Sequence, residues 1–295
     1  MANLKEIKLK IGSVKNTQKT TKAMKLVSSA KLTRTRQLSE QARSYARKIN
    51  DVLSDIAARV SKVQDEGNVS RAFVQNDTPK TIDIVFVTAD KGLCGGFNMA
   101  TIKTVSKLIA EYEAKGTKVR LRAAGRKGVD FFSFQGIALE QRVSDLSSAP
   151  EYDRAAEFIH AVVEDFRNEV TDKVIIVYNG FLNMLTQEIR VRELLPISLE
   201  KVEISDTASM LNIEPEDDED EVLNELTDKY IDFNMYYALI DSLAAEHSAR
   251  MQAMEAATKN AKEKVDSLTV EYNKARQAAI TTELIEIISG VESLK

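Results

Sequence analysis

The chain has 295 residues, of which 43% are hydrophobic and 29% charged, so it can bury a core in one or two domains. Its single cysteine argues against an intramolecular disulfide framework and a cysteine-based zinc site, and no apolar run is long enough to predict a membrane span. The net charge of −4 hides a strongly basic N-terminal part, which calls for an acidic partner. The first residues match neither a secretory signal nor a transit peptide, which favours a bacterial cytoplasmic protein.

Residues 1–60 predict one long helix with a coiled-coil seam. The stretch contains no proline and a single glycine, Gly12. Its apolar residues recur in alternating steps of three and four, which is the spacing of a helix that packs along one stripe. These seam residues are Leu4, Ile7, Ile11, Val14, Leu38, Ala42, Tyr45, Ile49, Val52 and Ile56.

The middle of the chain predicts a small, Rossmann-like α/β sheet domain over residues 80–210, after a linker at 61–79. Buried-strand patterns alternate with helical patterns, as expected for such a domain. The predicted strands are 81–89, 118–123, 173–178 and 188–195, the last of them partly exposed, and the predicted helices are 99–112 and 152–170.

An acidic loop at 211–221 precedes a second long helix at 222–295. Residues spaced by seven run along this helix in two rows, one from Leu226 to Ala275 and the other from Tyr230 to Ala279. About 70 residues at about 1.5 Å each predict a rod of roughly 100 Å. The predicted fold class is therefore α/β plus a long antiparallel coiled coil, with two long terminal helices flanking the sheet domain.

The residue types that usually carry chemistry predict no catalytic, cofactor or metal site. The glycine turn from Asp90 to Asn98 lies where a phosphate loop would, but it has neither the P-loop nor the dinucleotide-binding pattern, so we expect a structural turn. Cys94 is expected to be a buried structural thiol. His160 and His247 lie on predicted helices and are expected to have structural roles.

The C-terminal end of the second helix is apolar on all sides. A helix of this kind is normally buried all round, and at the end of a long rod the chain has nothing left to cover it. A partner must therefore supply a sleeve. The apolar residues of this tip are Ile280, Leu284, Ile285, Ile287, Ile288, Val291 and Leu294.

Several motifs resemble the gamma subunit family of bacterial F-type ATP synthases, nearly from end to end. They are Thr21–Leu32 in the first helix, the turn Asp90–Asn98, and Ser248–Met254, Tyr272–Ala278 and Thr281–Gly290 in the last helix. The family usually continues with Gly-Ala after the last motif, whereas Val291 follows Gly290 here. The paired-cysteine insertion of chloroplast members is absent, in agreement with the single Cys94.

The resemblance implies a non-catalytic central rotor shaft of a proton-translocating ATP synthase, peripheral to the cytoplasmic face of the bacterial inner membrane. Its implied partners are the alpha and beta subunits, the epsilon subunit and the membrane c-ring, and it implies no cofactor. By motif, Met24 and Lys25 would face the beta subunit from the first helix, and Arg276 and Gln277 from the second.

Two other classes remain open on the residues alone. The basic first helix would suit a coiled-coil protein that binds nucleic acid through phosphate contacts, although it lacks interleaved aromatic residues. The α/β domain would suit a nucleotide-binding enzyme. Salt-sensitive DNA retention would support the first, and micromolar binding of ATP or NAD the second.

Overall fold

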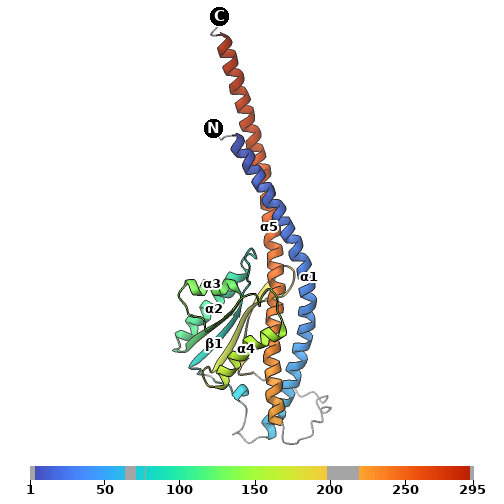
Figure 1. Cartoon of the computed structure of the whole chain (residues 1–295), viewed down its shortest axis with the longest axis vertical. Coiled ribbons are helices and arrows are strands. Elements are labelled where there is room, and N and C mark those ends of the chain that lie inside the picture. Colours follow the sequence, from blue (N-terminus) through green and yellow to red (C-terminus); the bar gives the residue numbers. More distant parts are fainter. Residues whose placement is uncertain (1–3, 64–70, 77, 198–218, 293–295) are drawn as a thin grey trace. The chain divides into compact units, whose positions relative to one another are not determined.

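The computed structural model describes residues 4–63, 71–76, 78–197 and 219–292. The chain divides into two units, one made of residues 1–29 with 250–295 and the other of residues 30–249. Two long helices, α1 (Leu4–Val63) and α5 (Glu219–Glu292), contribute to both units (Figure 1). The predicted fold class, long terminal helices flanking a small α/β sheet domain, is confirmed. Residues 211–218 of the predicted acidic loop, and Leu294, lie outside the described residues.

The larger unit contains a five-stranded sheet in the order β3-β2-β1-β4-β5. Its strands are β1 (Thr81–Val87), β2 (Lys118–Ala124), β3 (Gln141–Val143), β4 (Lys173–Phe181) and β5 (Gln187–Leu195). The first four strands are parallel, and β5 pairs antiparallel with β4 at the edge. The order of the parallel strands is that of a doubly wound fold, whose ligand crevice lies beyond the carboxyl ends of the strands where the strand order reverses.

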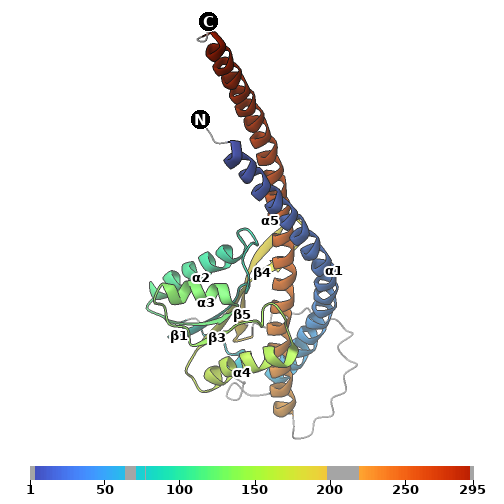
Figure 2. The ribbon, with the colours of Figure 1, turned by 45° about the horizontal axis from the view of Figure 1, so that its top comes forward.

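Helices cover both faces of this sheet, and the residue pattern of β1 explains why (Figure 2). Ile82, Ile84 and Phe86 point into a core with α2 (Phe97–Glu113) and α3 (Arg126–Phe134). Val85 and Val87 point the other way, into a core with α4 (Tyr152–Arg167) and the first half of α5. A strand that is buried on both faces has an almost continuous run of apolar residues, and the sequence of β1 shows such a run.

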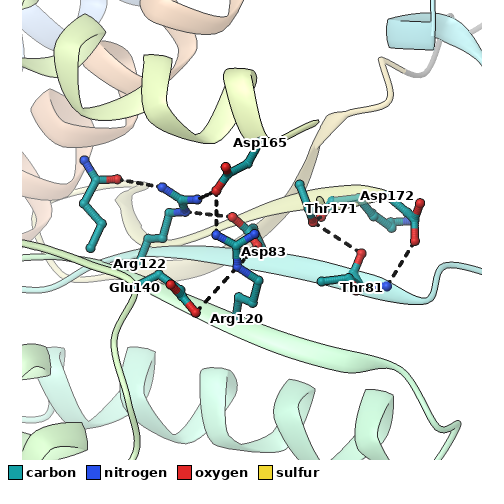
Figure 3. A network of polar contacts seen from close by, with 10 residues as sticks. Thr81, Asp83, Arg120, Arg122, Glu140, Asp165, Thr171 and Asp172 are labelled. Carbon is teal, nitrogen blue, oxygen red and sulfur yellow. Dashed lines mark hydrogen bonds and ion pairs between the residues drawn. The ribbon is translucent and has the colours of Figure 1, made fainter. Parts of the chain in front are cut away.

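A buried ion network interrupts the apolar core between β1, β2 and α4 (Figure 3). Asp83 is fully buried on β1, and the Nε atom of Arg122 on β2 donates to it over 2.7 Å. Arg120 lies 3.3 Å from the same carboxylate, and both arginines also contact Asp165 on α4. Because an unpaired buried charge is costly, the four groups hold α4 in one position on the sheet.

The two long helices pair antiparallel in each unit. In the unit of residues 1–29 and 250–295, Thr21 and Thr258 share a hydrogen bond of 2.7 Å, and Lys25 lies 2.6 Å from Glu255. In the unit of residues 30–249, the ring centroids of Tyr45 and Phe233 lie 4.4 Å apart, with the ring planes tilted by 57°. The polar seam positions of α1 are therefore matched by hydrogen-bonding residues on α5.

Several details differ from the sequence prediction. The first predicted strand ends at Val87 instead of residue 89, and α2 begins at Phe97 instead of residue 99. Helix α3 and the three-residue strand β3 were not predicted, because both are too short to show a clear periodicity. In the described residues, no helix combines the length and the apolar character needed to cross a bilayer.

The largest difference concerns α5. The heptad pattern predicts one buried stripe, but every residue from Tyr237 to Ala249 is buried. The α/β domain covers the side of the helix that the seam leaves free, because Ala238 and Leu239 enter the core beneath the sheet. This burial joins the sheet domain to α5 within the larger unit.

Candidate partner-binding surface

The end of α5 exposes the apolar tip that the sequence predicts. The described residues of this tip are exposed by 49–59% each, although all are large and apolar: Ile280, Leu284, Ile285, Ile287, Ile288 and Val291. Within the same unit, Glu271 of α5 lines a small cavity with Glu6, Ile7 and Lys10, close to the described start of α1 at Leu4. The tip therefore continues past the described start of α1. Exposed apolar patches of this kind mark surfaces that partners cover.

Met24 and Lys25, the two α1 residues implied to face a partner, lie beside each other and are half-buried. The Lys25 ammonium donates to Glu255 on α5 over 2.6 Å, so it already has one acidic neighbour within the chain. Both groups are partly open to solvent, and such a pair contributes only about 0–1 kcal/mol. A partner carboxylate can therefore compete for Lys25 at little cost.

Arg276 and Gln277, the two α5 residues implied to face a partner, are both exposed. They do not lie beside Met24 and Lys25. Glu255 marks the level of Lys25 on α5, and Arg276 lies about 30 Å further along the helix at about 1.5 Å per residue. The candidate surface therefore has two separate levels on the smaller unit, with the apolar tip next to the second.

The crevice where a doubly wound fold would bind a nucleotide is filled by α5. The glycine turn follows β1 and leads into α2 at the carboxyl end of the sheet. Its Cys94 and Phe97 are buried against Ala245 and Ala249 of α5. The small alanine side chains let the helix come close to the turn. The predicted structural turn therefore has a visible packing role, and the position of a nucleotide is occupied by protein.

Asp90 ties this turn to two neighbouring loops. Its carboxylate accepts from the backbone N–H groups of Arg126 and Asp145, over 2.9 and 3.1 Å, and from the Ser147 hydroxyl over 2.9 Å. Burial alone would raise the pKa of Asp90, but these hydrogen bonds together outweigh burial and hold the pKa below its usual value. The ionised carboxylate is thus a structural acceptor.

The remaining candidates for chemistry lie apart from one another. His160 on α4 lies 3.1 Å from the Asp232 carboxylate of α5, in a contact between two packed helices. His247 is buried within the enclosed stretch of α5. Within the ranges that the structure describes, no three His, Cys, Asp or Glu side chains gather as metal ligands.

The polar contacts that join the β4–β5 hairpin to α5 were not predicted from the sequence. Arg190 on β5 lies 2.7 Å from the buried carboxylate of Asp241. Asp241 lies between the predicted seam residues Ile240 and Ala244, and a carboxylate within so apolar a stretch was the available signal. Its partner is distant in sequence, so no spacing pattern could identify it.

The fold and its surface are those of a subunit that works through contacts with partners and not through a ligand site. Two long terminal helices pair in each unit, one of them closes the ligand crevice of the α/β domain, and that helix ends in an exposed apolar tip.

Comparison with known proteins identifies the family. The sequence pattern of the family described as ATP synthase matches residues 3–294. The ATP synthase gamma chain of Aliarcobacter butzleri is 90% identical over 295 residues, covering 100% of both chains. That of Sulfurovum sp. is 57% identical over 296 residues, again covering 100% of both. The chain belongs to the ATP synthase gamma chain family.

Solved structures share the fold at low sequence identity. A chain of the Euglena gracilis mitochondrial ATP synthase, in a structure of OSCP, F1 and the c-ring, has a TM-score of 0.67 at 19% identity. The match covers 99% of this chain and 94% of that one. A chain of the Tetrahymena thermophila central stalk and c-ring has a TM-score of 0.58 at 24% identity, covering 80% and 98%. As a gamma chain, the protein is a central rotor shaft and a stalk subunit, not a catalytic one.

Proposed function

We propose that this chain carries torque between a membrane c-ring and a catalytic hexamer of alpha and beta subunits. The observation that supports the proposal most strongly is the apolar tip of α5, whose large side chains are exposed around the helix. Apolar surface of this extent gains free energy when covered, at roughly 25 cal/mol per Å². A sleeve of alpha and beta subunits would cover the tip without fixing its rotational position, because apolar contacts have no preferred direction.

Charged and polar contacts lie below the tip in this proposal. Met24 and Lys25 face acidic groups of the beta subunit, and Arg276 and Gln277 form a second level of contact with alpha or beta. Their exposure and their separation along the helices suit two successive contact levels. Charge complementarity would control specificity and the rate of encounter more than affinity.

In this proposal the α/β domain contacts the epsilon subunit and the c-ring. The sequence-based domain boundaries are a helix at 1–60, a linker at 61–79, the α/β domain at 80–210, an acidic loop at 211–221 and a second helix at 222–295. We propose them with two changes that follow the structure: the first helix continues to Val63 and the second begins at Glu219. The complex would lie at the cytoplasmic face of a bacterial inner membrane and couple ATP to hydrogen ion transport. The high identity to bacterial gamma chains supports this location.

Cross-linking from the two ends tests the proposal. We expect Ile288→Cys to join to alpha or beta, and Glu216→Cys to join to epsilon or the c-ring, each in a Cys94→Ser background. The control is Lys107→Cys on the exposed side of α2, which should join to neither alpha nor beta. If Ile288→Cys joined to epsilon or the c-ring and Glu216→Cys joined to alpha or beta, the proposed orientation of the chain in the complex would be wrong.

Charge exchange tests the contact at Lys25. Lys25→Glu should lower ATP-driven ion pumping per ATP hydrolysed, because like charges across an interface can cost several kcal/mol. The double variant Lys25→Glu with Glu255→Lys restores the internal pair with the charges exchanged. If a group of a partner interacts with the charge at residue 25, ion pumping per ATP hydrolysed should stay low in the double variant. Full recovery in the double variant would show that only the internal pair matters.

A further inference from the structure

A buried carboxylate on α5 joins three elements of the larger unit. Asp241 is 2% exposed, and its Oδ2 atom accepts from Arg190 Nη1 on β5 over 2.7 Å. Its Oδ1 atom accepts from the Ser39 hydroxyl on α1 over 3.1 Å. The backbone N–H of Phe181, at the end of β4, also donates to the carboxylate. These four residues are called the Asp241 clamp below.

The surroundings of the clamp are shaped to hold it. Gly180 on β4 leaves the required space, because a Cβ atom there would lie 2.6 Å from Arg190 Nε and 2.7 Å from Asp241 Oδ2. Arg190 also reaches the Tyr237 hydroxyl over 3.4 Å. Burial works to lower the pKa of Arg190, but the Asp241 charge and the contacts with Tyr178 and Tyr237 together outweigh burial and keep the guanidinium ionised. Burial raises the pKa of Asp241, and the Arg190 charge and the Ser39 hydrogen bond act against that rise. The pair is thus hydrogen-bonded and enclosed.

A second contact lies two helical turns further along α5. Gln187 donates to the Ser248 hydroxyl over 3.0 Å, and this hydroxyl donates to the backbone carbonyl of Met184 over 2.9 Å. Ser248 follows Asp241 by seven residues, so both side chains lie on the same side of the helix. The β4–β5 hairpin therefore holds α5 at two heights.

We propose that Asp241 is a positioning residue for torque transfer, fixing the rotation of α5 about its own axis against the hairpin and α1. The enclosed stretch of α5 includes the small side chains of Ala238, Ala244, Ala245 and Ala249. Because the hydrophobic effect has no preferred direction, these small apolar contacts oppose a rotation of the helix less than hydrogen bonds do. A carboxylate held from three directions does resist it, because any rotation breaks at least one hydrogen bond. The inference rests on the proposed role of the chain in carrying torque.

The test uses the assembled synthase in inverted vesicles. Asp241→Asn and Arg190→Gln should each lower ion pumping per ATP hydrolysed, while ATP hydrolysis and the amount of assembled enzyme stay near wild type. The matched control is Arg167→Gln, which removes an exposed ion pair of 2.6 Å between α4 and Asp228 of α5. The control should pump normally. The double variant Asp241→Asn with Arg190→Gln should be no worse than the poorer single variant, because both changes act on one clamp.

Hydrogen exchange of the whole chain provides the local readout. Loss of a hydrogen bond to a charged group should increase opening of the amides around Asp241 on the order of tenfold or more. If amide exchange becomes faster but ion pumping per ATP hydrolysed stays normal, the clamp is purely structural and the proposal is overturned. The proposal is also overturned if neither amide exchange nor pumping per ATP changes.

Ser39→Ala covers the case in which Asp241→Asn does not assemble. It removes one hydrogen bond and keeps both charges, so the pumping ratio should fall by less but in the same direction. A wild-type ratio in Ser39→Ala would then overturn the proposal. Cross-linking at Ile288→Cys keeps the two hypotheses apart: if it joins to alpha or beta while Asp241→Asn couples normally, only the clamp proposal fails.

Discussion

Two stretches of α5 differ in how they treat polar and apolar side chains. Residues 237–249 are buried throughout, although they include Asp241, Ser242, Glu246, His247 and Ser248. The tip from Ile280 to Val291 is exposed, although its exposed side chains include isoleucine, leucine and valine. One helix thus contains a stretch whose polar side chains are covered by its own chain, and an apolar tip whose described side chains are exposed.

In a subunit of a larger assembly, this contrast separates the side chains that the chain itself covers from those that a partner covers. The enclosed stretch is covered within the chain, and its Asp241 and Ser248 side chains find partners on α1, on β5 and in the turn between β4 and β5. The apolar tip is exposed in the isolated chain, so its apolar side chains indicate a surface that a partner covers. Changes in the enclosed stretch should therefore affect the stability of the isolated chain, and changes in the tip should affect only the assembly.

The largest effect is expected at the tip. Ile285→Glu combined with Ile288→Glu should weaken the seating of α5 in the catalytic head by at least about 2 kcal/mol per residue, as for buried apolar anchors. The same pair should change the unfolding free energy of the isolated chain by no more than about 0.5 kcal/mol each, because both side chains are exposed. Co-purification with alpha and beta, beside thermal unfolding of the free chain, measures both. Equal damage to stability and assembly would remove the contrast between the two stretches.

The next effect concerns the enclosed stretch. Gly180→Ala should destabilise the isolated chain by about 1–3 kcal/mol, because the new methyl group overlaps the Asp241 clamp. Gly12→Ala is the matched control: no atom lies within 4 Å of its added Cβ, and alanine favours a helix by up to about 1 kcal/mol. Denaturant unfolding compares the two. Equal stability of both variants would show that the clamp region is loosely packed.

A pH-dependent effect is expected from the turn that covers α5. The pKa of Asp90 is lowered in the folded chain. The contribution of the ionised carboxylate to stability is therefore fully present above the unfolded pKa of about 3.9. It is lost as pH falls through the lower folded pKa. Asp90→Asn should therefore be less stable than wild type at neutral pH, and the difference should shrink as pH falls below about 4. A difference that stays constant between neutral pH and pH 3 contradicts this account of the carboxylate.

The smallest effect is expected at Cys94. The thiol is buried against Phe97 and two alanines of α5, so Cys94→Ala should cost about 1 kcal/mol from a small cavity. Dithiothreitol should not change the activity of the assembled enzyme, because the structural thiol has no partner cysteine in the chain. A reversible activation by dithiothreitol that disappears in Cys94→Ala would show a redox role instead.

Much of the fold could be predicted from the sequence, because its periodic patterns are long. The seven-residue spacing identified α5, and the apolar runs identified β1 and β4. Helix α3 and strand β3 are short, and tertiary contacts decide their conformation more than local pattern does.

The candidate site was only partly predictable. The tip could be identified because apolar residues surround the helix, a property of sequence alone. The enclosure of residues 237–249 could not, since it depends on contacts with β4 and β5, whose residues are far away in the chain. The sequence alone predicts that Arg190 is an exposed residue of an edge strand. Only the tertiary fold brings it next to Asp241.

Thiol labelling at the tip tests the central claim most directly. Ile288→Cys, in a Cys94→Ala background, should react quickly in the isolated chain, because residue 288 is exposed there. In the assembled synthase the same cysteine should react far more slowly, while Lys107→Cys on the exposed side of α2 reacts at the same rate in both. That result means that alpha and beta cover the tip. An equal labelling rate at residue 288 in the free and assembled forms would contradict the account.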